Sequence, residues 1–308
     1  MRGYITDPAG PSGLRLVSGL PEPQAAQGQF VLEVKAFSVN PGETKLIEQR
    51  PDGWRPGQDV AGVVRRPAPD GSGPTQGSRV VCRADWEGWA ERVAVPVTRS
   101  AVLPDQVTFE QAATLPIAGL TALRALRVGG ALLGREVLVT GATGGVGQFA
   151  LQLASLSGAR VTAHVSSSER IPQALELGAE RAVTSLDDPS LGPFHLALDG
   201  VAGPLLTSVV RRLAPGATAV VYGGHNGPTE LRLRDFFTGQ GWNARVQGFV
   251  SEYPEETKGE DLSILVRLVA AGQVNPVIGR VADWTDVPAV LDSWAQRAFR
   301  GKAVLQRS

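Results

Sequence analysis

Residues 137–147 read VLVTGATGGVG and are the strongest indication of the fold of this chain. It begins with apolar and β-branched residues typical of a buried strand, continues as a glycine-rich turn, and leads into the helical sequence of 148–154. Its last six residues fit the pattern A-x-G-x-x-G, with Ala142, Gly144 and Gly147 at the three key positions. Strand, turn and helix in this order form a dinucleotide-binding fingerprint.

Each key position of this turn has a physical role. Ala142 allows the tight turn, the missing side chain of Gly144 lets the backbone approach a pyrophosphate, and Gly147 lets the helix lie close to the strand. The N-terminus of the helix offers unpaired N–H groups and a partial positive charge to the phosphates. A ligand-free turn is the alternative, but the agreement of strand, turn and helix favours a nucleotide site. The predicted phosphate-binding residues are Ala142, Thr143, Gly144, Gly145, Val146 and Gly147.

The end of the next strand bears on the choice of cofactor. NAD-preferring sites place Asp or Glu there, whereas the predicted strand 158–165 is followed by Ser166 and Ser167, with Arg170 close behind. Serine hydroxyls can donate to a 2′-phosphate, and Arg170 can add a charge-assisted contact. These residues predict NADPH as the cofactor in place of NADH. The alternative is that the serines only cap the next helix and that Arg170 is a solvated first-turn residue.

The composition gives no support to several other classes of function. Lys+Arg 30 balances Asp+Glu 30, so there is no electrostatic case for binding nucleic acid or an anionic membrane. The N-terminus lacks the apolar core of a signal peptide, and no apolar run approaches membrane-spanning length. We therefore expect a soluble cytoplasmic protein. A chain of 308 residues, 43% of them hydrophobic, is long enough for two domains.

The pattern along the chain falls into three parts. The first, to about residue 116, is strand-rich, with predicted strands at 30–36, 59–64, 78–82 and 89–95. The second alternates strands with helices, and its predicted strands are 137–140, 158–165, 182–185, 194–199, 219–224 and 245–250. Such alternation predicts a parallel sheet with helices on both faces. The third contains helical stretches near 261–271 and 287–298 and a last strand at 302–305.

Several ordered motifs accompany the glycine turn. They are SVNP at 38–41, PGQDVAGVV at 56–64, AATLP at 112–116 and GKAVL at 301–305. With these motifs the chain resembles the medium-chain dehydrogenase/reductase superfamily, in its zinc-independent quinone oxidoreductase (zeta-crystallin-like) branch. The resemblance implies an α/β fold in which residues 1–115 and 253–308 form a GroES-like β-rich domain. Residues 116–252 would form a Rossmann NADPH-binding domain with a doubly wound parallel six-stranded sheet. It also implies a homodimer paired edge to edge through strand 245–250.

Zinc-dependent relatives place a cysteine ligand within 37–42 and a His-Glu pair where this chain has Gln58 and Asp59. Neither Cys nor His is present at these positions, and catalytic zinc normally needs three protein ligands. The histidines and the single cysteine are His164, His195, His225 and Cys82. The first two lie in predicted strands and, like Cys82, are interpreted as packed core residues. His225 follows the fifth strand and is interpreted as a loop residue without a role, or as one near the cofactor. The sequence predicts no metal site.

Without zinc, the chemistry that remains is hydride donation from NADPH to an acceptor that is already electrophilic. A quinone or an α,β-unsaturated carbonyl compound fits this requirement. By resemblance, Asn40 and Thr121 should lie near the nicotinamide and Asp59 near the substrate. The residues implied as catalytic are Asn40, Asp59 and Thr121. Asn40 and Thr121 are also implied as cofactor contacts, and the further ones are Gly223, Gly224, Phe249 and Lys302.

Alternatives remain for these residues and for the function. Asn40 can be a turn residue before Pro41, Thr121 can cap the helix after Gly119, and Asp59 can bridge backbone groups. Many relatives have a tyrosine between the VNP and Pro-Gly-x-Asp motifs, but this chain has none there, which leaves the proton donor unassigned. The alternative functions are an enoyl-thioester reductase of the same superfamily and a non-catalytic NADPH-binding redox sensor or scaffold.

Overall fold

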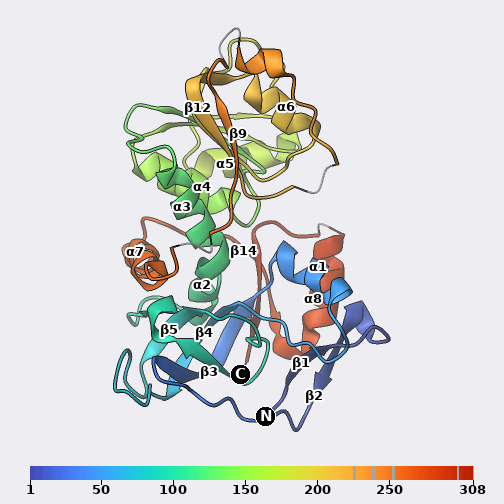
Figure 1. The fold of residues 1–308 in the computed structure, drawn as a ribbon, viewed down its shortest axis with the longest axis vertical. Helices are drawn as coiled ribbons and strands as arrows, with labels where there is room; N and C mark the ends of the chain where they lie inside the picture. The colour runs from blue at the N-terminus through green and yellow to red at the C-terminus, as the bar shows by residue number, and fades with distance from the viewer. Residues whose placement is uncertain (225–226, 238–240, 252–253, 297, 308) are drawn as a thin grey trace. The chain divides into compact units, whose positions relative to one another are not determined.

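The computed structural model describes residues 1–224, 227–237, 241–251, 254–296 and 298–307. The chain divides into two compact units, and both chain ends belong to the first (Figure 1). Unit 1 comprises Met1–Leu120 and Glu252–Ser308, and unit 2 comprises Thr121–Ser251. His225 lies outside the described residues. Among the described residues, no helix is long and apolar enough to cross a membrane.

Strand β3 (Gln29–Ser38) organises the main sheet of unit 1. It pairs antiparallel with β4 (Asp59–Arg66), with β6 (Arg92–Pro96) and with the C-terminal strand β15 (Lys302–Gln306). The sheet continues through β4 to β5 (Arg79–Arg83) and β7 (Ser100–Val102), and through β15 to β14 (Ile278–Asp283). Strands β1 (Gly3–Thr6) and β2 (Leu14–Val17) form a separate antiparallel ribbon.

The core of unit 1 joins the two ends of the chain. Phe30 and Phe37 of β3 lie in one apolar cluster with Leu291 and Leu305 from the C-terminal segment, and the Phe37 ring stacks on Trp89 at 5.6 Å between centroids. The C-terminal segment therefore completes the core of the N-terminal part by burying apolar surface. The helices of unit 1 are α1 (Pro41–Gln49), α2 (Phe109–Ala113), α7 (Lys258–Ala270) and α8 (Val287–Ala295).

Unit 2 is built on a six-stranded sheet in which all neighbouring strands are parallel. In chain order the strands are β8 (Glu136–Thr140), β9 (Arg160–His164), β10 (Arg181–Val183), β11 (Phe194–Asp199), β12 (Leu213–Val221) and β13 (Arg245–Gly248). Their order in the sheet is β10-β9-β8-β11-β12-β13. Successive strands are therefore added first on one side of β8 and then on the other, and the topological switch point lies between β8 and β11. This arrangement confirms the doubly wound sheet, and ligands of such sheets bind at the carboxyl ends beside the switch. The helices are α3 (Leu120–Arg127), α4 (Gly147–Leu156), α5 (Ile171–Glu176) and α6 (Pro204–Val210).

Several strands differ from the sequence prediction, which did not include β1, β2 and β7. β12 ends at Val221, so the residues expected to complete it lie beyond the strand. β6 begins at Arg92, because Trp89 is buried in the core and Ala90 makes only an isolated bridge to Gly3. β14 was not predicted, since this edge strand keeps most of its side chains exposed and therefore lacks an apolar alternation.

Candidate functional site

The glycine turn of unit 2 connects β8 to α4. Its left-handed residue is Gly141, with φ +59°, while Ala142 is fully buried. The left-handed position of the tight turn is therefore Gly141, because only glycine adopts this conformation without steric cost, while the predicted role of Ala142 stays a prediction. A Cβ on Gly147 would lie 2.4 Å from the Gly141 oxygen and 2.7 Å from Ala142 Cα. Gly147 thus permits the close approach of helix and strand, as predicted.

Gly144 has a different environment. A Cβ placed there would meet only the Gly141 oxygen, at 3.0 Å. The other side of Gly144 is open, and α4 begins three residues later with its N–H groups directed to this end of the helix. A turn that is open at Gly144 and closed at Gly147 fits a pyrophosphate at the N-terminus of α4.

We expect Gly147→Ala to weaken cofactor binding and to destabilise unit 2. The added methyl group would meet backbone atoms, which cannot rotate away, so the turn must shift by an overpacking cost of about 1–3 kcal/mol. Thermal unfolding and the Kd for NADP+ are the measurements. Gly134→Ala is the control for a new methyl group, since nothing lies within 4 Å of it, although its positive φ adds strain. Equal Kd values for both variants would contradict the expectation.

The segment after β9 meets the glycine turn. Arg170 Nη1 donates to Thr143 Oγ1 at 3.2 Å, which brings together two residues predicted independently from the sequence. Ser166 is exposed, and Ser167 is half-buried at the start of a short helix, Ser168–Arg170, without a side-chain capping bond. The capping alternative for Ser167 is therefore wrong, and Arg170 lies at the turn and is more than a solvated residue.

A buried carboxylate at the switch point escaped the sequence analysis. Asp199, the last residue of β11, is fully buried and accepts from the Thr140 hydroxyl and from the backbone N–H of Ala202 at 2.9 Å. Ala202 has φ +57°, so Asp199 stabilises a strained loop beside the glycine turn. The sequence signal for Asp199 was a carboxylate as the last residue of a predicted buried strand.

Gly223 and Gly224 pack against this loop. A Cβ on Gly223 would lie 2.7 Å from the Gly200 oxygen, and one on Gly224 would lie 2.9 Å from Ala202 Cβ. Tyr222 precedes them with its hydroxyl 3.4 Å from the Thr140 carbonyl oxygen, and burial raises the pKa of this phenol. The two glycines therefore belong to the same carboxyl edge of the sheet as the glycine turn.

Thr121 and Phe249 are the two remaining site residues predicted in unit 2. Thr121 is the second residue of α3, which continues directly from the helical turn Leu115–Gly119, and its hydroxyl donates to Ser251 Oγ at 3.1 Å. Because the helix does not begin at Thr121, the capping alternative is wrong. The Phe249 N–H donates to the Val221 oxygen at 2.8 Å, which extends the end of β12.

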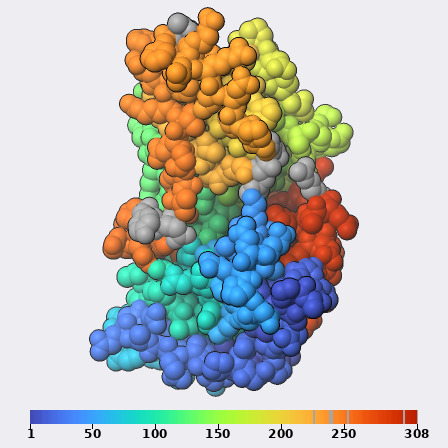
Figure 2. Space-filling model, turned by 45° about the vertical axis from the view of Figure 1, so that its right-hand side comes forward, coloured from blue at the N-terminus to red at the C-terminus, as the bar shows by residue number. Residues whose placement is uncertain are grey.

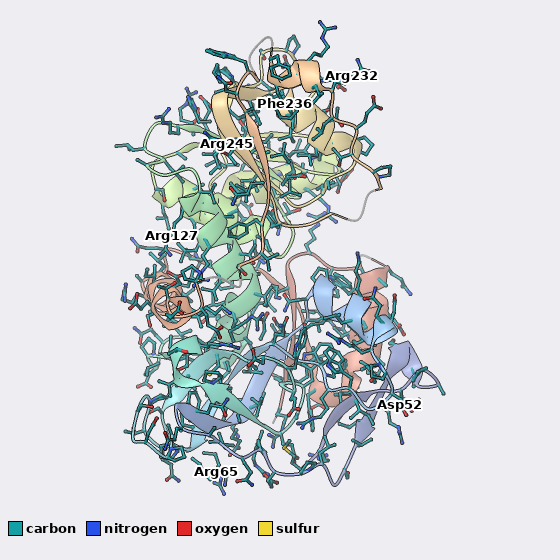
Figure 3. The ribbon with its side chains drawn as sticks, viewed as in Figure 1. Asp52, Arg65, Arg127, Arg232, Phe236 and Arg245 are labelled. Atoms are coloured by element: carbon teal, nitrogen blue, oxygen red, sulfur yellow. The ribbon has the colours of Figure 1, made fainter. Side chains whose placement is uncertain are left out.

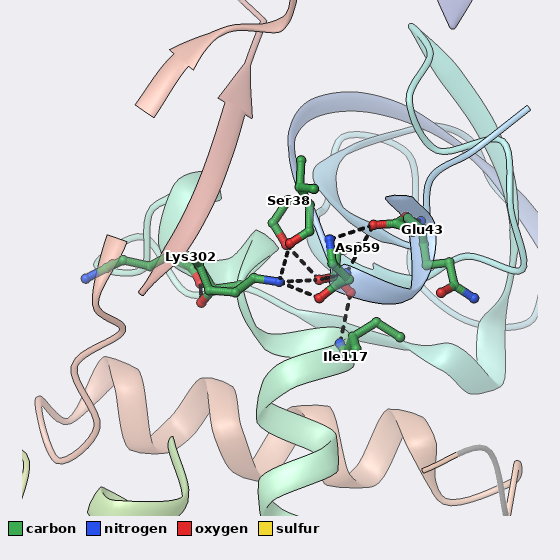
Figure 4. Close-up of polar contacts among 10 residues, drawn as sticks. Ser38, Glu43, Asp59, Ile117 and Lys302 are labelled. Carbon is green, nitrogen blue, oxygen red and sulfur yellow. Dashed lines mark hydrogen bonds and ion pairs between the residues drawn. The ribbon is translucent and has the colours of Figure 1, made fainter. Parts of the chain in front are cut away.

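A buried polar cluster forms in unit 1 around Asp59, the first residue of β4. In the antiparallel register Asp59 lies opposite Ser38 of β3, and Ser38 Oγ donates to Asp59 Oδ2 at 2.6 Å (Figure 4). The Ile117 backbone N–H donates to Asp59 Oδ1 at 2.8 Å, so Asp59 does bridge to the backbone. We call Ser38, Asn40, Glu43, Asp59 and Lys302 the polar cluster.

Lys302 supplies the cation of the polar cluster. Its Nζ donates to Asp59 Oδ2 at 3.2 Å, to Asn40 Oδ1 at 2.6 Å and to the Val39 oxygen at 3.1 Å. Lys302 is 3% exposed and Asp59 is fully buried, so this ion pair is shielded from solvent. The structure thus brings together Asn40, Asp59 and Lys302, which are 262 residues apart at most.

Glu43 is the member of the polar cluster that the sequence analysis missed. It lies in the first turn of α1, where its carboxyl group accepts from the Asn40 N–H and from the Gln58 N–H, each at 2.9 Å. Burial and the nearby Asp59 carboxylate raise the pKa of Glu43 to about 8, although Lys302 and the two N–H donors oppose this. Asn40 and Glu43 fit the N-x-x-E spacing of a capping box, which was the available signal.

A zinc ion does not fit these residues. The positions that bind zinc in metal-dependent relatives are next to cations here: Lys302 donates to Asp59, and Gln58, with its amide in the orientation that satisfies both atoms, accepts from Arg83 Nη2 at 2.9 Å. Cys82 is buried in β5 and burial raises the pKa of its thiol, which disfavours the thiolate that zinc requires. In the described ranges no three His, Cys, Asp or Glu side chains gather as ligands.

The two histidines within the described residues lie in strands of unit 2. His164 and His195 are half-buried at the end of β9 and within β11, and His195 Nδ1 accepts from the Glu136 N–H at 3.1 Å.

Unit 1 also has a surface groove of about 650 Å³ where α1, in light blue, lies beside the red C-terminal segment (Figure 2). Ile47, Leu291 and Trp294 contribute to its lining, and no predicted site residue does.

The chain is similar to known oxidoreductases over nearly all of its length. Residues 145–267 match the family model described as zinc-binding dehydrogenase. The quinone oxidoreductase of Mus musculus is 29% identical over 289 residues, which cover 88% of this chain and 86% of that protein. The quinone oxidoreductase structure from Coxiella burnetii has a TM-score of 0.83 at 25% identity and covers 100% of this chain and 99% of its own. A thermostable alcohol dehydrogenase from Pyrobaculum aerophilum has a TM-score of 0.84 at 25% identity, with the same coverage.

These likenesses agree with the two-unit fold, the glycine turn at the switch point of the parallel sheet, and the motifs of the polar cluster. The chain carries a zinc-binding dehydrogenase domain and is a homologue of quinone oxidoreductases of the medium-chain dehydrogenase/reductase type.

Proposed function

We propose that this protein is a zinc-independent, NADPH-dependent oxidoreductase that transfers a hydride to a quinone or an α,β-unsaturated carbonyl compound. The observation that carries the proposal is the contact of Arg170 with Thr143, which places a guanidinium at the glycine turn. A bound nicotinamide cofactor supplies the hydride, while the protein supplies binding, orientation and electrostatics.

The preference for NADPH rests on the end of β9. No carboxylate follows the strand directly, and Ser166, Ser167 and Arg170 offer hydroxyl and guanidinium donors to a 2′-phosphate. Arg170 at the turn can contact a phosphate with charge-assisted hydrogen bonds. The turn residues 142–147 would hold the pyrophosphate, and Gly223, Gly224 and Phe249 would line the same edge of the sheet.

The proposed acceptor follows from the polar cluster of unit 1. Because cations occupy the neighbourhood of Gln58 and Asp59, no metal is available to polarise an alcohol there, and an acceptor that is already electrophilic is favoured. We assign Asn40, Asp59 and Thr121 to the catalytic surroundings. Lys302 would act there through Asn40, since its Nζ already donates to three oxygens within unit 1.

The direct test is the loss of reduced-nicotinamide absorbance with quinones, enones and enoyl thioesters, with NADPH and NADH in parallel. Turnover of quinones or enones with NADPH supports the proposal. Turnover of thioesters alone would replace it with an enoyl-thioester reductase. Tight NADPH binding without oxidation by any acceptor would replace it with a sensor or scaffold.

Arg170→Ala should raise the KM for NADPH about tenfold and leave the KM for NADH nearly unchanged. The variant removes a charge-assisted contact that only the 2′-phosphate can use, and such contacts contribute about 1.5–3 kcal/mol. Steady-state kinetics with both cofactors measures the difference. Arg135→Ala removes an exposed guanidinium beside the opposite, amino end of β8 and serves as the control. An equal increase of the KM for NADPH and for NADH in Arg170→Ala would contradict the assignment of Arg170 to the 2′-phosphate.

We also propose a homodimer through β13. Among the described strands β13 is at the edge of the sheet, where it pairs with β12, and Arg245 marks it in Figure 3. Exposed large apolar side chains surround it in sequence: Leu231, Leu233, Phe237, Trp242 and Val250. An open edge bordered by apolar side chains is a surface that a second copy can cover.

The double variant Phe237→Asp with Val250→Asp should convert the dimer into a monomer. Each side chain is more than 70% exposed in this chain, with 76% for Phe237 and 73% for Val250, so the fold tolerates the charge while a paired copy does not. Light scattering after size-exclusion chromatography gives the mass. Val102→Asp, on the 60% exposed Val102 of β7, is the control. A wild-type protein that is monomeric at micromolar concentration would refute the dimer.

A further inference from the structure

The surface groove of unit 1 lies against the C-terminal halves of α1 and α8. α1 contributes Ile47 and Glu48 to its lining, and α8 contributes Leu291, Asp292 and Trp294. All of these residues belong to unit 1. The volume of about 650 Å³ is within the range of about 300–1,000 Å³ that is usual for small-molecule sites. The groove is therefore large enough for a ligand of its own.

The floor of the groove is apolar. Ile47 and Leu291 belong to the apolar cluster of unit 1, and each is only 6% exposed. Trp294 is half-buried and adds an aromatic side chain to the lining. Such a surface can pack against an aliphatic or aromatic body, and an indole ring also attracts a cation to its π face.

The charges at the ends of the two helices oppose helix stability. The last four residues read LIEQ in α1 and DSWA in α8, so each last turn contains an acid and neither contains Lys or Arg. The C-terminus of a helix carries a partial negative charge, which repels an acid placed there. Both acids, Glu48 and Asp292, are exposed and line the groove. A cation bound in the groove would offset this repulsion at both helices.

Asp292 is held in place at the groove. Ser12 Oγ donates to Asp292 Oδ1 at 2.8 Å. A carboxylate has about four lone-pair sites, so this hydrogen bond orients Asp292 and leaves acceptor capacity for a ligand. Arg50 also lines the groove, and its guanidinium lies over the Trp54 ring, 5.7 Å from the centroid. Two carboxylates and one guanidinium give the described lining a net negative charge.

We propose that this groove binds a small organic cation, in which an ammonium group is attached to an aromatic or aliphatic body. Asp292 accepts from the ammonium, and Glu48 adds to the negative potential. The body packs on Ile47, Leu291 and Trp294. None of the described lining residues is a predicted catalytic or cofactor contact, so the proposal is independent of the proposed oxidoreductase activity.

Three probes that share a phenylethyl body test the charge preference: 2-phenylethylamine, 2-phenylethanol and 3-phenylpropanoate. At neutral pH they are a cation, an uncharged alcohol and an anion. Calorimetry on the full chain without cofactor should give a Kd for the amine about tenfold below that for the alcohol, with the anion binding most weakly. Equal Kd values for the amine and the alcohol would overturn the proposal.

The place of binding is tested with the indole ¹⁵N–H signals. The chain has six tryptophans, and the signal of Trp294 is assigned by its loss in Trp294→Phe. We expect 2-phenylethylamine to shift this signal and to leave that of Trp89, which is fully buried in the core, unchanged. Amine binding without a shift of the Trp294 signal would place the site elsewhere and refute the assignment of the groove.

The role of the carboxylate is tested with Asp292→Asn, which keeps an oxygen that can accept from Ser12 and removes only the charge. The variant should bind the amine about tenfold more weakly and the alcohol equally well. Asp105→Asn, at an exposed acid of unit 1 outside the lining, is the matched control. If Asp292→Asn fails to fold, Glu48→Lys at an exposed position should weaken amine binding by placing a cation at the groove. Unchanged amine binding in the folded variant contradicts the proposal.

Discussion

Lys302→Met is expected to destabilise the protein by about 3–5 kcal/mol, the usual range when one partner of a buried ion pair is removed. Methionine retains the length of the side chain but leaves Asp59 without its cation and the Asn40 and Val39 oxygens without a donor. Asp59 is fully buried, so water cannot easily replace the ammonium. Urea unfolding followed by fluorescence and circular dichroism measures the loss.

Lys35→Met provides a control with the same chemistry at the surface. Lys35 Nζ is 2.8 Å from Glu33 Oε1, but the two side chains are 33% and 28% exposed. Water screens this pair, and its loss should cost at most about 1 kcal/mol. If Lys302→Met costs no more than Lys35→Met, the polar cluster is open to water and the proposed action of Lys302 through Asn40 fails.

The stability of the folded protein should fall as the pH rises from about 4.5 to about 8, because of Glu43. Its pKa is about 8 in the folded protein, against an ordinary value of 4.5 in the unfolded chain. Between these values the folded state keeps a proton that the unfolded state has released, so increasing pH favours unfolding. A pKa raised from 4.5 to about 8 lowers the free energy of unfolding by on the order of 5 kcal/mol across this pH range.

The comparison with Glu43→Gln isolates this contribution. The variant cannot ionise at position 43, so the difference in unfolding free energy between it and wild-type protein should change steadily from pH 5 to pH 8. His164 works in the opposite direction, because burial lowers its pKa from 6.5, but it contributes equally to both proteins. Glu48→Gln, at an exposed position of the same helix, should keep the wild-type pH profile. A difference that is independent of pH would show that Glu43 does not titrate in this window.

The sequence predicted the parts of the fold that depend on neighbours along the chain. β8 and β11 are mostly apolar strands, and their predicted positions agree with the structure because a buried strand of a parallel sheet needs apolar residues on both faces. The glycine turn could also be predicted from the sequence, since its conformation is set by a few consecutive residues. Even there the left-handed position belonged to Gly141, because backbone angles do not follow from residue type alone.

The candidate site of unit 1 was only partly accessible from the sequence. The motifs indicated Asn40, Asp59 and Lys302 separately, but nothing in the chain showed that they share hydrogen bonds. Glu43 was missed because a glutamate in the first turn of a helix is usually solvated, and only the burial of its side chain next to Asp59 makes it unusual. β14 could not be distinguished from a loop because most of its side chains are exposed, so its sequence lacks an apolar alternation.

By itself, then, the sequence determined the alternating strands and helices of unit 2, the glycine turn and the family. These depend on local backbone preference and on apolar periodicity, which a linear pattern records. The meeting of Ser38, Asp59 and Lys302 in one buried cluster, with the Asn40 oxygen facing the ammonium, follows only from the folded arrangement of the chain. Such polarity arises from the register of strands distant in sequence and from the exclusion of water around paired charges, and both exist only once the chain has folded.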